Sequence, residues 1–303
     1  MANQKPSQTR QAAARAGARN VRSGKKKQSF LQRNWIMLSA IGVLVVALIA
    51  LIVAASNSNP PSITGQIGQP APANVLKALE SPDAGLFNAV SGGGVAVALT
   101  KVANTPVQNG PNGKPQFLYI GGEYCPYCAA DRWSYIMALS RFGTFKNLKL
   151  MASSDTDSFP TTATFSFAGS SFTSQYVDFV PVEASDRARK ELEKLTDQES
   201  ALMAKYNATP YVQSAGGIPF ISIGNQFVRN GSGYDPSVIN GQTWDQIAQK
   251  LTDSSDPVTK AVVGNANYLT AAICLTTNNQ PGNVCTAAPI PNIEKILQQL
   301  PGK

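Results

Sequence analysis

The chain of 303 residues contains no histidine and only four cysteines. Covalent attachment of a c-type haem uses the sequence C-x-x-C-H, so the lack of histidine excludes that class even though one C-x-x-C pair is present. No internal repeat is visible along the chain. With 43% apolar residues, the chain can form a sizeable hydrophobic core in one large or two ordinary domains.

Acidic residues are missing from positions 1–34, which carry nine basic ones. The net charge of the whole chain is +8, from 26 basic and 18 acidic side chains. Without this tail, 17 basic and 18 acidic residues remain, so the rest of the chain is nearly neutral. A basic tail of this kind is typical of a topology signal that contacts anionic lipid, and we expect no nucleic-acid binding.

Charge of either sign is missing from residues 35–55, "WIMLSAIGVLVVALIALIVAA". At about 1.5 Å per residue, a helix of this length spans roughly 30 Å, the thickness of the hydrocarbon core of a bilayer. The positive-inside rule then places residues 1–34 in the cytoplasm and the C-terminal part outside it, as a single-pass protein of the cell membrane. The alternative is a cleaved signal peptide, because "VAAS" at 53–56 resembles a cleavage site. The length of the apolar run favours an anchor.

The composition changes again after this apolar run. Residues 56–73 contain four prolines and no charge, which is typical of a semi-extended spacer. We expect the main folded domain at 74–252 and a helical extension at 253–303. Outside the cytoplasm disulfides persist, so thiol–disulfide chemistry is favoured over zinc for the cysteines.

Hydrophobic patterning of the folded part alternates between strands and helices. This order implies an α/β sandwich around a mixed sheet, because crossover connections favour parallel pairing and a hairpin forces an antiparallel edge. The expected elements are strands at 94–102, 116–121 and 147–153, a helix that opens at Cys125, a charged helix at 186–206, a hairpin over 216–228 that turns at Gly224 and Asn225, and helices at 243–251 and 256–275.

The sequence "GGEYCPYCAADRW" places Cys125 and Cys128 at the junction of a strand and a helix. At a helix N-terminus, unpaired N–H groups and the helix dipole favour a thiolate, which is the nucleophilic form of cysteine. Pro126 suits the first helical turn because its missing N–H has no partner there in any case. Cys128, one turn further in, is expected to be more buried. The spacing predicts an exchange cycle in which Cys125 attacks and Cys128 resolves the mixed disulfide.

The other two cysteines, Cys274 and Cys285, flank the turn-rich sequence "CLTTNNQPGNVC". A structural disulfide that closes this loop is the favoured interpretation, and a second redox pair that relays electrons is the alternative. A four-cysteine zinc site would need this pair as well as the C-x-x-C pair, and its spacing of ten intervening residues is unlike that of zinc sites. We expect no metal and no cofactor.

The combination of "FLYIGGEYCPYC", a strand near 147–153, "GIPFISIGNQFV" and a closing helix resembles the thioredoxin superfamily. C-P-Y-C is the glutaredoxin-type motif, whereas a membrane tether and an insertion are more like the extracytoplasmic disulfide oxidoreductases and an uncharacterised family of membrane-anchored thioredoxin-like proteins. The resemblance covers about half of the chain, 94–251. It implies a thioredoxin-like three-layer sandwich with one N-terminal transmembrane helix and an insertion, at about 155–185, before the cis-proline strand.

The same resemblance implies roles for individual residues. Cys125 and Cys128 would be catalytic, and the Ile218–Pro219 peptide bond would be cis. Substrate would be bound by a set that surrounds the cysteines: Tyr124, Pro126, Tyr127, Ile218 and Pro219.

Several departures from the superfamily pattern are visible. Tyr124 replaces the usual tryptophan before the first cysteine, and Tyr127 replaces the histidine of the strongest oxidases. For the buried carboxylate that thioredoxins use in proton transfer, the nearest candidates are Glu123 and Asp131, which equally suit surface positions. No glutathione-binding element is recognisable.

The expected function is that of a membrane-anchored, extracytoplasmic thiol–disulfide oxidoreductase that acts on protein thiols and is served by a membrane or extracytoplasmic redox partner. The direction of electron flow stays open, because oxidases, reductases and isomerases share this site. One alternative is a non-catalytic binding protein on the same scaffold, in which the C-x-x-C pair is a permanent disulfide. A copper- or zinc-binding thiol protein is another.

Overall fold

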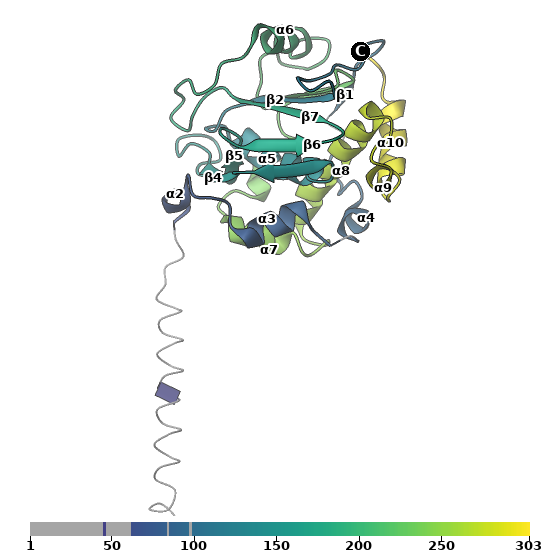
Figure 1. Ribbon diagram of the computed structural model, residues 1–303. Helices are drawn as coiled ribbons and strands as arrows, with labels where there is room; N and C mark the ends of the chain where they lie inside the picture. Colours follow the sequence, from purple (N-terminus) through teal and green to yellow (C-terminus); the bar gives the residue numbers. More distant parts are fainter. Residues whose placement is uncertain (1–44, 47–61, 84, 97–98) are drawn as a thin grey trace, which may run out of the picture. The chain divides into compact units, whose positions relative to one another are not determined.

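The structure is a computed structural model that describes residues 45–46, 62–83, 85–96 and 99–303 (Figure 1). The chain divides into two units, 1–60 and 61–303, and nearly all of the described residues belong to the second. The expected tail at 1–34 and the expected membrane span at 35–55 lie outside the described residues, apart from Val45 and Val46. Among the described residues no helix has both the length and the apolar character needed to cross a bilayer.

A mixed five-stranded sheet forms the centre of the second unit, with the order β1-β9-β8-β2-β7. Strand β7 is parallel to β2, and the remaining neighbours are antiparallel. The expected mixed α/β fold is therefore confirmed. The strands of this sheet are β1 (Thr100–Lys101), β2 (Gln116–Gly121), β7 (Asp178–Glu183), β8 (Phe220–Ile223) and β9 (Phe227–Asn230).

Strand β2 is buried along its whole length, and its side chains alternate between two hydrophobic cores. Phe117 and Tyr119 belong to the larger core, which α5 and α8 cover. Leu118 and Ile120 belong to a smaller core that includes Tyr206 of α6. The sheet is thus covered by helices on both faces, with α6 on one side and α5 and α8 on the other (Figure 1).

Helix α5 is the central helix of the unit. Every one of its residues except Tyr127 is buried, and it packs against α8, α3 and β5. Helix α8 in turn contacts α10, α4 and α7, so the C-terminal helices belong to the same hydrophobic core as the sheet. The helices of eight or more residues are α3 (Ala73–Glu80), α5 (Pro126–Leu139), α6 (Asp197–Tyr206), α8 (Pro257–Thr276) and α10 (Ile290–Gln299). The shorter ones are α2 (Ile63–Gln66), α4 (Leu86–Val90), the 3-10 helix η1 (Pro236–Val238), α7 (Trp244–Lys250) and α9 (Gly282–Cys285).

Two small antiparallel sheets lie between α5 and β7 in the sequence. They pair β3 (Gly143–Lys146) with β6 (Ser171–Ser174), and β4 (Lys149–Ala152) with β5 (Ala163–Ser166). Residues 62–73, which we expected to belong to a free spacer, are docked on β4. The N–H groups of Gly68 and Ala71 donate to the carbonyl groups of Leu150 and Leu148, so this segment satisfies the free edge of β4.

Several local expectations are confirmed by the structure. Strand β2, the start of α5 and the β8–β9 hairpin lie where the patterning placed them. The hairpin turns at Gly224 and Asn225, both with φ of 55°, which is the left-handed conformation that a two-residue turn requires. Thr243 caps α7 by accepting a hydrogen bond from the N–H of Gln246.

The expected helix at 186–206 is wrong in its first half, because α6 begins only after Thr196. The Asp186 carboxylate accepts hydrogen bonds from the N–H groups of Ala188 and Lys190 and so closes a local turn. Arg189 has φ of 65°, which no α-helix contains. Thr196 and Glu199 then form a capping box that starts the helix. Charged composition suits a helix, but turn and cap chemistry decide where it begins.

Two strand expectations also need correction. Of the strand expected at 94–102, the structure assigns only β1 among the residues that it describes. The strand expected at 147–153 exists as β4, but it pairs with β5 and not with the central sheet. The parallel neighbour of β2 is β7, which lies within the insertion expected at about 155–185. Strand β7 carries a short apolar run at 179–182, and the sequence does not reveal which of two nearby strands joins β2.

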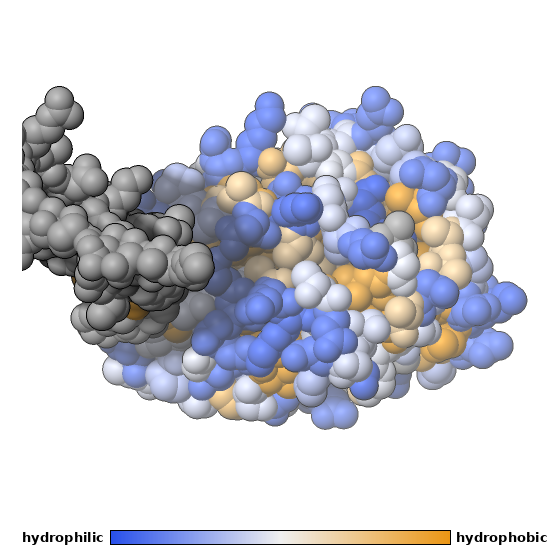
Figure 2. Space-filling view, turned by 90° about the horizontal axis from the view of Figure 1, so that it is seen from below, coloured by the Kyte–Doolittle hydropathy of each residue, from blue (hydrophilic) through white to orange (hydrophobic). Residues whose placement is uncertain are grey.

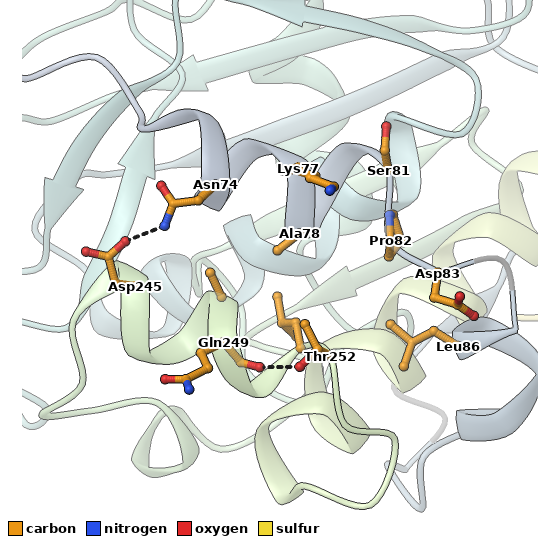
Figure 3. A pocket seen from close by; sticks show the side chains of 12 residues that line it. Asn74, Lys77, Ala78, Ser81, Pro82, Asp83, Leu86, Asp245, Gln249 and Thr252 are labelled. Carbon is orange, nitrogen blue, oxygen red and sulfur yellow. Dashed lines mark hydrogen bonds between the residues drawn. The ribbon is translucent and has the colours of Figure 1, made fainter.

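A groove of about 360 Å³ lies between α3 and α7 (Figure 3). The amide of Asn74 donates to the carboxylate of Asp245 across one end of it, at 2.7 Å. Figure 2 shows apolar surface set among polar residues when the unit is seen from below. The groove shares no residue with the cysteine site that is described next.

Candidate functional site

Cys125 is the N-cap residue of α5, directly after the turn that follows β2. Its Sγ atom accepts a hydrogen bond from the N–H of Cys128 at 3.3 Å. A sulfur atom in this position takes the place of the hydroxyl or carboxylate oxygen that usually caps a helix. Pro126 occupies the first helical position, as expected. The local sequence therefore places one sulfur atom at the N-terminus of a 14-residue helix, where backbone N–H groups point toward it.

The two cysteines have different environments although they are three positions apart. Both are free thiols, and Cys125 keeps 5% of its surface exposed whereas Cys128 is completely buried. A sulfur atom that approaches from solvent therefore reaches Cys125 first. This is the arrangement that the spacing predicts for an attacking and a resolving cysteine.

The pKa values of the two thiols are shifted in opposite directions. A hydrogen bond with the Cys128 side chain lowers the pKa of Cys125, against the opposing effect of burial, and the Cys128 N–H and the Arg132 guanidinium lower it further. Burial raises the pKa of Cys128 well above its usual value, and the neighbouring Cys125 raises it further. Of the two thiols in the reduced pair, Cys125 is therefore the one that ionises first.

The segment before β8 lies against the same sulfur atom. The Cys125 thiol contacts the carbonyl oxygen of Ile218 at 3.8 Å, although 93 residues separate the two. The Ile218–Pro219 peptide bond is cis, as the resemblance implies. The sheet thus brings two of the expected substrate-binding residues, Ile218 and Pro219, next to the cysteine pair.

The remaining expected substrate-binding residues form the rim of the site. Tyr127 is 40% exposed, and its ring meets that of Phe159 edge to face, with centroids 5.9 Å apart. Tyr124 is half-buried, and the guanidinium of Arg189 stacks 4.0 Å above its ring. Pro126 is buried at the start of α5. The entrance to Cys125 is therefore aromatic, with one stacked cation.

Glu123 and Asp131, the two candidates for a buried carboxylate, are both buried. Asp131 forms an ion pair with Arg229 of β9 and also accepts hydrogen bonds from the N–H of Gly233 and the amide of Asn265, so its oxygens are engaged in structure. Glu123 accepts a hydrogen bond of 2.6 Å from the Ser166 hydroxyl. Burial raises the pKa of the Glu123 carboxyl, and this hydrogen bond opposes the shift.

A second buried ion pair, which sequence reasoning missed, lies beside the cysteines. Arg132 of α5 donates to Glu183 at the end of β7, from Nε to Oε1 at 2.9 Å and from Nη2 to Oε2 at 2.7 Å. Both side chains are fully buried. The only signal in the sequence is that Arg132 follows Cys128 by four positions and so shares its face of the helix. Nothing in the sequence connects it with Glu183, 51 residues later.

Gly121, which precedes the site, has a packing role at this point. A Cβ atom at this position would overlap the Tyr119 hydroxyl. That hydroxyl donates to Oε2 of Glu183 at 3.3 Å. The glycine therefore leaves room for a tyrosine that contacts the ion pair from the strand side.

Cys274 and Cys285 form a disulfide with a Cα–Cα distance of 5.6 Å. It joins the end of α8 to α9, and both residues are almost completely buried. Because these two sulfur atoms are bonded to each other, a zinc site that combines all four cysteines does not form. By the chain-entropy relation, closing a loop of this size contributes about 2–3 kcal/mol to stability.

Comparison with known proteins places this site within a family. The pattern described as "Domain of unknown function (DUF929)" matches residues 99–275, a region that contains the central sheet, α5 and most of α8. The chain therefore belongs to this family. No curated protein and no solved structure matches the chain.

Proposed function

We propose that this member of the DUF929 family is a thiol–disulfide oxidoreductase whose active site is the Cys125–Cys128 pair. The observation that carries the proposal is the position of Cys125. Its sulfur atom caps α5, accepts the N–H of Cys128 at 3.3 Å and lies 3.8 Å from the carbonyl oxygen of Ile218. A binding protein with a permanent disulfide has no need of a lowered thiol pKa at one cysteine and a raised one at the other.

The proposed reaction is disulfide exchange in two steps. The Cys125 thiolate attacks a disulfide of a substrate protein, the substrate S–S bond breaks and one substrate thiolate leaves. Cys128 then attacks Sγ of Cys125, forms the Cys125–Cys128 disulfide and expels the second substrate thiolate. The Cys128 proton must leave in that step, and its proposed acceptor is Glu123, a buried carboxylate two residues before Cys125 that belongs to neither ion pair. Each step is reversible, so the same site serves both directions.

The proposal includes the finer fold assignment, a thioredoxin-like sandwich. Its support is the strand–C-P-Y-C–helix connection, the cis-proline that precedes β8, and helices on both faces of a mixed sheet. It also includes the location. The basic residues at 1–34 and the uncharged residues at 35–55 support a single-pass anchor with the catalytic unit outside the cytoplasm.

Redox titration of the full-length protein tests the proposal. The protein is equilibrated in glutathione buffers of increasing oxidised fraction, alkylated, and mapped by mass spectrometry to find which thiols are free. We expect Cys125 and Cys128 to convert together within the range of these buffers, while Cys274 and Cys285 stay protected. If Cys125 and Cys128 do not interconvert, or convert independently of each other, the proposal is wrong.

Two matched variants assign the roles within the pair. Cys128→Ser removes the resolving thiol, so oxidised glutathione should remain attached to Cys125 as a stable mixed disulfide. Cys125→Ser retains the completely buried Cys128, and we expect no adduct under the same conditions. Equal adduct formation on both variants would contradict the assignment of Cys125 as the attacking residue.

A further inference from the structure

The Arg132 guanidinium is the buried cation of the cysteine site. It lies on α5 four residues after Cys128, a spacing that puts the two side chains about 5–6 Å apart at Cβ. Its Nη2 atom also donates to the carbonyl oxygen of Gly122, the turn residue that precedes the cysteines, at 2.9 Å. Arg132 therefore binds the turn before the cysteines through Gly122 and shares the first turns of α5 with Cys128.

The hydrogen bonds of this guanidinium are incomplete. Nε and Nη2 are satisfied by Glu183 and Gly122, but the buried Nη1 has no hydrogen-bond partner among the described residues. A buried charged donor without a partner is costly, and an uncharged side chain of similar size would avoid this cost. What sets this guanidinium apart from other buried ones is its position beside the two thiols.

The Glu183 carboxylate offsets only part of the effect of this cation on the thiols. Burial raises the pKa of Tyr119 well above its usual value, so its hydroxyl contributes no charge near neutral pH. Glu183 is held in the bidentate pair, and Arg189 over Tyr124 adds a second cation at the rim. Arg132 lowers the pKa of both thiols. A cation that stabilises a thiolate stabilises the reduced state of the pair over the disulfide.

We infer that Arg132 is a positioning residue that makes the Cys125–Cys128 pair an oxidant, so that its substrates are proteins with two free thiols. This inference rests on the proposed exchange function and fixes its preferred direction. A C-x-x-C pair whose reduced form is stabilised gives up its disulfide readily, because the stabilised Cys125 thiolate is a good leaving group when the second substrate thiol completes the exchange.

The reaction in this direction balances without a further reagent. A substrate thiolate attacks Sγ of Cys125, the Cys125–Cys128 bond breaks, and Cys128 leaves and takes a proton. The second substrate thiolate attacks the first substrate sulfur and expels Cys125 as a thiolate. The substrate loses two electrons and two protons, and the cysteine pair accepts the two electrons. A partner disulfide must then accept these electrons to restore the pair.

The test measures the equilibrium constant between the full-length protein and glutathione. Arg132→Gln removes the cation, so we expect the equilibrium to shift about tenfold toward the Cys125–Cys128 disulfide, which corresponds to about 30 mV. Glu183→Gln retains the cation and removes its counter-charge, so the shift should have the opposite sign. Arg132→Lys keeps the charge and should restore most of the wild-type value. Ultraviolet absorbance of the Cys125 thiolate against pH should show matching shifts of its pKa.

Shifts of opposite sign in the equilibrium constant distinguish an electrostatic role of Arg132 from a structural one. Simple loss of packing would shift the constants of Arg132→Gln and Glu183→Gln in the same direction. If either single variant fails to fold, the double variant Arg132→Met with Glu183→Met leaves no unpaired charge, and its equilibrium constant should shift in the same direction as that expected for Arg132→Gln but by less. Asp131→Asn, in the neighbouring ion pair, is the control and should leave the constant unchanged.

The outcomes of this experiment are distinguishable. If the wild-type pair does not equilibrate with glutathione at all, the proposed function is wrong. If the wild type equilibrates but neither the Arg132 variants nor the double variant changes the constant, the inference about Arg132 is wrong and the exchange function stands. A wild-type pair as reducing as an ordinary structural disulfide would also overturn the assignment as an oxidant.

Discussion

Two consecutive residues of α5 enter two buried ion pairs that differ in their surroundings. Asp131 pairs with Arg229 of β9, and Arg132 pairs with Glu183 of β7, so α5 is tied to two different strands of the same sheet. One nitrogen of each guanidinium lacks a hydrogen-bond partner within the described part of the chain. The number of hydrogen bonds therefore does not distinguish the two pairs.

The neighbours of each pair do distinguish them. Asp131 accepts additional hydrogen bonds from the Gly233 N–H at 3.0 Å, the Asn265 amide at 2.9 Å and the Tyr135 hydroxyl at 2.7 Å. These neutral donors come from three parts of the fold and join α5 to α8 and to the segment after β9. The neighbours of Arg132, by contrast, include two thiols. The first pair stabilises the arrangement of elements, and we expect the second to act on the cysteines.

The largest effect is expected from breaking the structural pair. Asp131→Asn leaves the Arg229 guanidinium buried without its counter-charge, which costs about 3–5 kcal/mol of unfolding free energy. Chemical denaturation of the full-length protein measures this loss. The thiol–disulfide equilibrium of the folded variant should equal that of the wild type. An altered equilibrium would mean that the two ion pairs are coupled.

The disulfide between Cys274 and Cys285 provides a check that redox measurements do not simply follow stability. The double variant Cys274→Ala with Cys285→Ala should lower the unfolding free energy by about 2–3 kcal/mol, because the loop is no longer closed in the unfolded chain. Its Cys125–Cys128 equilibrium should be unchanged. If this variant stopped exchanging electrons at Cys125, the disulfide would instead be a relay between the site and a partner.

A smaller effect, with a distinctive pH dependence, is expected at Glu123. Burial raises the pKa of its carboxyl in the folded chain, so ionisation above the unfolded-state value of about 4.3 destabilises the native state. Glu123→Gln cannot ionise and so avoids this loss of stability. The variant should equal the wild type below pH 4, and its advantage in unfolding free energy should grow as pH rises from the unfolded-state pKa through the folded-state pKa and then level off. Denaturation across pH 4–8 measures it. An advantage that does not change with pH would contradict the assignment.

Small effects of unequal size are expected from removing one hydroxyl at each ion pair. Tyr135 donates to Asp131 at 2.7 Å, whereas Tyr119 donates to Glu183 at 3.3 Å. A hydrogen bond to a charged group contributes about 1.5 kcal/mol when short and less when long, so Tyr135→Phe should cost about 1.5 and Tyr119→Phe about 0.5 kcal/mol. Urea denaturation of the two variants side by side gives the difference. A reversed order would show that the pair beside the cysteines is the more important for stability.

Much of the cysteine site can be predicted from sequence because its signals are local. The apolar run 116–121 and the spacing of Cys125, Pro126 and Cys128 specify a strand, a capped helix and two unequal sulfur atoms within about fifteen residues. The Gly224-Asn225 turn and the Thr243 cap are equally local. In each case the chemistry of one or two side chains decides the backbone conformation.

The features that escaped prediction depend on partners that are distant in the sequence. The ion pairs join residues 51 and 98 positions apart, and no periodicity encodes such a pairing. Strand β7 was missed as a member of the central sheet for the same reason, since β4 has a comparable apolar pattern and follows α5 sooner. The helix expected at 186–206 failed because the Asp186 turn and the Thr196 cap outweigh helix propensity.

The parallel pairing of β2 with β7 has a consequence for the order of folding. Contacts that are distant in sequence form slowly, because the intervening chain must first lose its freedom. Arg132 is synthesised well before Glu183, so a nascent chain has its cysteine pair before it has the carboxylate that holds the neighbouring cation. Until β7 docks, the Arg132 guanidinium beside the two thiols has no buried counter-charge. Under the proposed function, the docking of β7 is therefore the folding event that completes the electrostatic surroundings of the cysteine pair.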